Sequence, residues 1–83
     1  MPTVAILDGI KIEFYYDEHP PPHFHARYAE HIIQIDIETL DVIKGFLPPA
    51  QRRKVLEWAA LQGDHLIRAW LSCAAGRVPE KFL

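Results

Sequence analysis

The chain lacks several features that define whole classes of protein. It has one cysteine, Cys73, among 83 residues, so it cannot form an internal disulfide. No uninterrupted apolar run approaches the roughly 18 residues that a membrane span needs. The first residues also lack the basic start and long apolar run of a signal peptide. The sequence therefore predicts a cytoplasmic protein with no membrane association.

Positive charge is not in excess either. The formal net charge is −2, which gives no general attraction to nucleic acid or to anionic membranes. A nucleic-acid contact would have to come from a local patch, and the basic run Arg52–Lys54 fits a solvated helix face. The apolar content of 49% and the charged content of 24% are those of a globular protein. The length predicts a single domain over residues 1–83.

The first half of the chain has the pattern of short β-strands. In "TVAIL" and "IKIEFYY" the β-branched and aromatic residues dominate, and Asp8-Gly9 between them favours a tight hairpin. Pro20–Pro22 is a stiff, extended connector, because proline fixes its backbone and has no N–H to donate. The segments "HFHARY", "HIIQIDIE" and "VIKGF" complete a predicted set of four to five strands over about residues 3–46.

The second half changes to a helical period over about residues 49–75, with a tail at 76–83. Pro48-Pro49 can open a helix, and apolar stripes that include Trp58 and Trp70 follow. Gly63 either separates two helices or lies within one bent helix. Strands followed by helices predict an α+β fold, in which an antiparallel sheet is covered on one face by two C-terminal helices.

A two-residue turn at Ala29-Glu30 would fix the pairing of the two strands around it. Phe24 then faces Ile35 and His23 faces Asp36, so that apolar residues meet on one face and polar residues on the other. A slip of one residue would mix the faces, which supports this register. The predicted polar face carries Lys11, Glu13, Tyr15, His23, His25, Arg27, Gln34 and Asp36.

Four residues of this face are candidate catalytic groups: His23, His25, Arg27 and Asp36. A carboxylate opposite an imidazole orients the ring and favours its charged form, and an arginine can hold a phosphate. One imidazole could accept a proton while the other donates one, as in metal-independent cleavage of a phosphodiester. The alternative is an ordinary solvated sheet face with no chemistry.

A metal site is a weaker alternative. His19, His23 and His25 offer three nitrogens in a His-x-x-x-His-x-His pattern. This spacing lacks cysteine and matches no known template, so we expect neither a metal nor another cofactor.

A protein partner competes with catalysis as the purpose of this face. Its strands also carry four residues whose apolar or aromatic side chains could contact a partner: Val4, Ile6, Tyr15 and Ile32. Apolar groups among charged ones are typical of a protein–protein interface. The same residues could also form the interface of a homodimer.

Several stretches together resemble one bacterial family. They are "MPTV", "DEHPPPHFHARY", "IDIET", the Gly-x-Leu-Pro at Gly45–Pro48 and "EWA…L…AW". The chain is similar over nearly its whole length to the domain of unknown function 4160 family, although Leu40 stands where many relatives would have glycine. The resemblance implies a toxin component of a toxin–antitoxin pair, with a cognate small protein of the domain of unknown function 2442 type as partner. It implies no catalytic assignment and no target.

Overall fold

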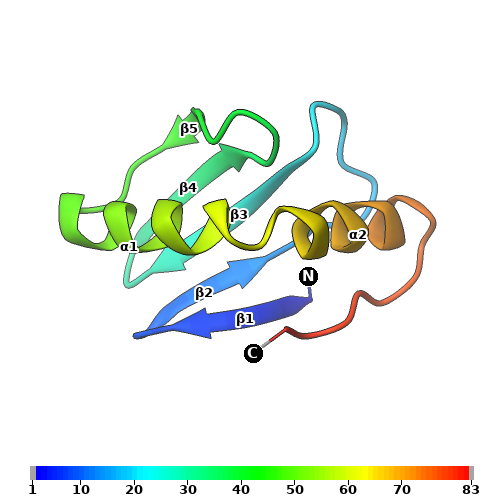
Figure 1. The fold of residues 1–83 in the computed structure, drawn as a ribbon, viewed down its shortest axis with the longest axis horizontal. Helices are drawn as coiled ribbons and strands as arrows, with labels where there is room; N and C mark the ends of the chain where they lie inside the picture. The colour runs from blue at the N-terminus through cyan, green and yellow to red at the C-terminus, as the bar shows by residue number, and fades with distance from the viewer. Residues whose placement is uncertain (1, 83) are drawn as a thin grey trace.

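A computed structural model describes residues 2–82 and has a five-stranded sheet followed by two helices (Figure 1). Neighbouring strands are antiparallel and follow one another in chain order. The elements are β1 (Thr3–Leu7), β2 (Ile10–Glu13), β3 (His23–Tyr28), β4 (His31–Asp36), β5 (Val42–Gly45), α1 (Pro49–Ala60) and α2 (Gly63–Ala74). The predicted α+β fold is confirmed.

Tight turns set the order of the sheet. At the β1–β2 hairpin, Asp8 and Gly9 have φ of 46° and 81°, the left-handed conformation that a tight hairpin requires. Leu40 also has a positive φ, 62°. This explains why glycine suits that position, since a side chain makes the left-handed region costly.

The register of β3 and β4 is the one that the sequence predicts. His23 pairs with Asp36 and Phe24 pairs with Ile35 across the two strands. Ala29, in the two-residue turn between the strands, has φ of 53°. Phe24 and Ile35 are fully buried on the face that the helices cover. The opposite face, which we call the open face, carries His23, His25 and Arg27.

The helical segment is two helices rather than one. Leu61 and Gln62 separate α1 from α2, and Gly63 is the first residue of α2. The two helices follow one another across the same face of the sheet (Figure 1). Among residues 2–82, no helix combines the length and the apolar character that crossing a membrane requires.

The core lies between this face and the helices. Its largest fully buried side chains are Phe14, Phe24, Ile10, Ile12, Ile33, Ile35, Leu47, Leu66, Val4 and Val55. Trp70 is buried at the edge of this core, and Trp58 packs edge-to-face on Phe24 with ring centroids 6.4 Å apart. Both tryptophans therefore pack against the core, as their place in the apolar stripes predicts.

Val4 does not have the position that simple alternation gives it. The β1–β2 register shifts between Thr3 and Ala5, and both Val4 and Ala5 are buried, at 1% and 4% exposure. The C-terminal tail also pairs with β1, where the Phe82 N–H donates to the Val4 carbonyl. Val4 is thus a core residue and is not available to a partner, contrary to the sequence-based expectation.

Candidate functional site

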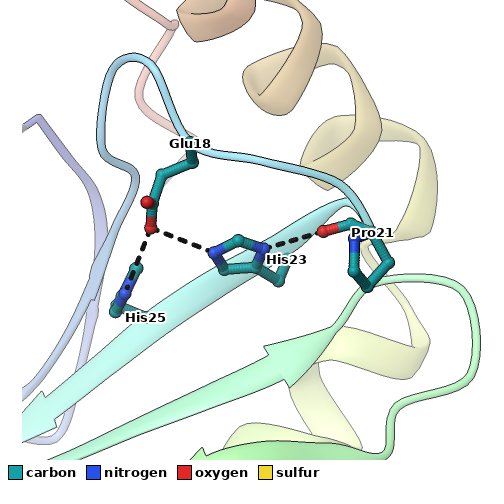
Figure 2. Close-up of polar contacts among 4 residues, drawn as sticks. All are labelled: Glu18, Pro21, His23 and His25. Carbon is teal, nitrogen blue, oxygen red and sulfur yellow. Dashed lines mark hydrogen bonds and ion pairs between the residues drawn. The ribbon is translucent and has the colours of Figure 1, made fainter.

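The candidate site forms where the proline-rich loop, residues 14–22, lies over the start of β3. Glu18 points from this loop toward His23 and His25, as Figure 2 shows. The two histidines are two positions apart on β3, so their side chains lie on the same face. Phe24 between them points into the core. The strand therefore fixes the spacing of the two imidazoles, and the loop supplies the carboxylate.

One carboxylate oxygen serves both histidines. Glu18 Oε1 lies 3.1 Å from His23 Nε2, within hydrogen-bond range, and 3.6 Å from His25 Nε2 (Figure 2). The candidate ligand atoms of the three residues all lie within 4.8 Å of one another. We call Glu18, His23 and His25 the Glu–His–His cluster.

The second nitrogen of His23 also has a partner. His23 Nδ1 lies 2.7 Å from the carbonyl oxygen of Pro21 (Figure 2), an oxygen that can only accept. A neutral imidazole donates from one nitrogen only. With its hydrogen on Nδ1, a neutral His23 turns the Nε2 lone pair toward Glu18. A proton or a metal ion between the two atoms would turn this contact into an attractive one.

His25 is the more enclosed of the two imidazoles. It is 4% exposed, and the Tyr15 ring stacks on it with centroids 4.0 Å apart. Burial lowers the pKa of His25, and the neighbouring His23 lowers it further, against opposing effects of Glu18 and Glu13. Within residues 2–82, His25 Nδ1 has no hydrogen-bond partner. The surroundings of His25 thus disfavour its charged form relative to a histidine in water.

Arg27 is held by a carboxylate of its own protein. Its Nε donates to Glu13 Oε1 over 3.3 Å, and the Glu13 side chain is only 9% exposed. Neighbouring strands place the two residues close together, since Lys11 pairs with Arg27 and Glu13 with His25. The guanidinium that the sequence suggests for phosphate binding therefore balances a buried charge in this structure.

Asp36 does not orient His23, although the two residues are paired across the strands. Its carboxylate accepts the backbone N–H groups of Glu38 (2.7 Å) and Thr39 (3.0 Å) in the turn after β4. Glu18 makes the contact with His23 that was expected of Asp36. Sequence reasoning missed Glu18 because strand pairing says nothing about a loop, and its nearness to His23 in the chain was the only available signal.

His19 lies outside the cluster. Its side chain is exposed, whereas the cluster contains Glu18 and the two β3 histidines. The set of three histidines considered from the sequence is therefore not brought together, and two of its members meet a carboxylate instead.

A row of exposed and half-buried side chains crosses the open face beside the cluster. Register pairs Ile6 with Lys11, Lys11 with Arg27, and Arg27 with Ile32, one residue from each of four strands. Ile6 and Ile32 are 54% and 37% exposed. We call these four residues the open row. Of the other residues considered for a partner, Val4 is buried and Tyr15 is half-buried against His25.

Comparison with protein families supports the resemblance seen in the sequence. The model of the family described as "Domain of unknown function (DUF4160)" matches residues 9–71, which include the cluster and most of the open row. The chain belongs to this family. It has no significant match among curated proteins or among solved structures. Family membership is thus confirmed, and the family description assigns neither an activity nor a partner.

Proposed function

We propose that the chain is the toxin-like component of a bacterial toxin–antitoxin pair, and that a cognate small protein docks on its open row. The partner expected is of the domain of unknown function 2442 type, which is what the family resemblance implies. The protein then works as a binding module whose biological effect depends on whether that partner is present.

The observation that carries this proposal is the contrast in exposure on the open face. His23 and His25 are 7% and 4% exposed, whereas Ile6 and Ile32 are 54% and 37% exposed. When a partner covers an apolar side chain, the free energy of the complex falls by about 25 cal/mol per Å² of apolar surface that leaves water. The available surface therefore favours recognition of a protein over direct attack by the histidines.

The chemistry of the row defines the partner. Lys11 and Arg27 stand between the two isoleucines, and Lys44 is exposed on β5. A matching surface would offer apolar side chains with aspartates or glutamates beside them, since charge complementarity selects the partner and speeds association. A homodimer through the same row would bring these cations together and is disfavoured.

Co-expression with the cognate protein tests the proposal. We expect the wild-type chain to co-purify with it and the Ile6→Asp/Ile32→Asp variant to lose it, because aspartates would meet carboxylates of the partner. Leu61→Asp is the matched control, since Leu61 is 84% exposed and lies after α1, away from the row. If the double variant, shown to be folded by circular dichroism, still captured the partner as well as Leu61→Asp does, docking on this row would be wrong.

A second candidate is action on nucleic acid through His23 and His25. The favouring observation is that both imidazoles approach one carboxylate oxygen, with His25 biased toward its neutral, proton-accepting form. General acid–base catalysis uses such a pair of groups. The loop over the cluster would have to move before a phosphodiester could reach the ring nitrogens.

Bacterial growth distinguishes the two candidates. Catalysis predicts that induction of the wild-type chain alone arrests growth, that His23→Ala/His25→Ala of equal solubility does not, and that both co-purify with the partner. The binding module predicts that the double variant retains the partner and the effect together or loses them together. Assays of the purified chain on RNA and DNA complete the test, and cleavage that is unchanged in the double variant would remove the histidines from the chemistry.

A further inference from the structure

We infer that the Glu–His–His cluster is a binding site for a divalent transition-metal ion of the zinc type. This goes beyond partner docking and does not depend on it, because Glu18 lies in the loop and the two histidines lie under it, outside the open row. The inference also changes the ligand set considered from the sequence, in which His19 stood where the structure has Glu18.

The spacing of the cluster fits such an ion. Zinc lies about 2.0–2.2 Å from histidine nitrogen and carboxylate oxygen, so two ligands at a tetrahedral angle are about 3.3–3.5 Å apart. Glu18 Oε1 lies 3.1 Å and 3.6 Å from the Nε2 atoms of His23 and His25, close to that value on either side. The imidazole–imidazole separation, at most 4.8 Å, needs to shorten by no more than about 1.5 Å.

The hydrogen bond on the far side of His23 is the kind that metal ligands make. A ligating histidine usually donates its other N–H to a carbonyl or a carboxylate, which fixes the tautomer and the ring orientation. His23 has this arrangement, with Nδ1 2.7 Å from the Pro21 carbonyl oxygen and Nε2 turned to Glu18. The carbonyl belongs to the proline triplet, whose backbone is stiff. The loop thus positions both a ligand and the group that orients another ligand.

Two imidazole nitrogens and one carboxylate oxygen converge in a place shielded from water. His23 and His25 are 7% and 4% exposed, and the shared Glu18 oxygen faces both rings. In the tautomers whose Nε2 lone pairs face the carboxylate, these groups repel one another unless a cation lies between them, and burial strengthens that repulsion. Two nitrogens and one oxygen are the donor set of zinc and of neighbouring metals such as nickel or cobalt, rather than of magnesium or calcium.

A bound ion would fasten the loop to the sheet. It would link Glu18 of the loop to two residues of β3, in a domain small enough to need such support. It would also use the nitrogen lone pairs that acid–base chemistry requires. A metal at this position therefore argues for a structural role of the histidines and against their action as free proton carriers.

The experiment uses the full chain without a histidine tag, stripped with a chelator and titrated with Zn²⁺ alone by calorimetry and by thermal unfolding. We expect one saturable Zn²⁺ site per chain and a rise in the midpoint of unfolding, because an ion that binds only the folded state stabilises it. Glu18→Gln keeps the shape of the side chain but removes its charge, and should weaken binding at least about tenfold. His25→Ala should abolish it.

His19→Ala/His65→Ala is the matched control, since both side chains are exposed and lie outside the cluster. This variant should bind Zn²⁺ as the wild type does. Absence of saturable binding by the wild-type chain would overturn the inference, and so would wild-type affinity in Glu18→Gln. If His25→Ala did not fold, Glu18→Gln would decide. Partner capture is measured separately, so a failure here leaves the proposed docking to be judged by its own test.

Discussion

The two ends of the open face differ in how far they are covered and in which side chains they expose to water. At the end where β3 begins, Glu18, Tyr15 and Trp70 enclose two histidines, so that these polar side chains are buried. A few residues along the same strands, the open row keeps two isoleucines in water. One face of one sheet thus contains a closed polar site and an open apolar surface. The loop and α2 make this difference, since the loop supplies Glu18 and the Trp70 ring of α2 lies 5.1 Å from that of His23.

Gly45→Ala should give the largest effect at the open end, because backbone pairing supports that end. Gly45 has φ of 89°, and an added Cβ would lie against the carbonyl oxygen of Ile32 in the open row. We expect a loss of about 3 kcal/mol or more in the free energy of unfolding, the sum of backbone strain and steric overlap. Urea unfolding monitored by circular dichroism measures it.

Gly9→Ala is the control for Gly45→Ala. Gly9 has a similar φ of 81°, with no heavy atom of another element within 4 Å of the added Cβ. Only the strain of the left-handed conformation then applies, about 1–2 kcal/mol. Equal losses in the two variants would mean that close packing of β5 on β4 is not what supports the row.

Arg27→Ala should have the next largest effect, because Arg27 connects the two ends. Arg27 pairs with Ile32 in the open row, and its guanidinium donates to the buried Glu13 near the closed end. Removing it leaves a carboxylate buried without its partner, which should cost about 1–3 kcal/mol. Glu13→Gln on the same background should recover part of the loss. Lys11→Ala, an exposed neighbour in the row, should stay within about 0.5 kcal/mol of the wild type, and a loss as large as that of Arg27→Ala would refute the explanation.

The two ends also differ in how well the sequence predicts them, because strand pairing determines the open end and a loop covers the closed end. The pairing of β3 with β4 could be predicted because a short turn and a period of two leave one register that separates apolar from polar residues. Phe24 facing Ile35 and His23 facing Asp36 both follow from that rule. The pairing of Arg27 with Ile32 in the open row therefore follows from pattern alone, whereas in β1 a bulge shifts the alternation and buries Val4.

The closed end could not be predicted in this way. A polar side chain on a sheet face is expected to meet water, and nothing in the strand pattern signals that a loop will fold over it. Asp36 was expected beside His23 because the strands pair them, but its carboxylate accepts the amides of its own turn. Glu18 comes from a segment whose path depends on tertiary contacts. The closeness of histidine, proline and glutamate in the sequence indicates where the site lies but not which side chains contact one another.

Tyr15 should give the smallest of these effects and tests whether stacking closes the site. The ring lies nearly parallel to that of His25, at an interplanar angle of 22°, and stacking of this kind contributes about 0.5–1.5 kcal/mol. Tyr15→Phe keeps the ring and should change stability by less than about 0.5 kcal/mol, whereas Tyr15→Ala should lose the stacking energy and speed proteolysis within residues 14–22. Limited proteolysis and urea unfolding of both variants measure this. Loss of stability in Tyr15→Phe as large as in Tyr15→Ala would mean that the hydroxyl, and not the ring, closes this end of the face.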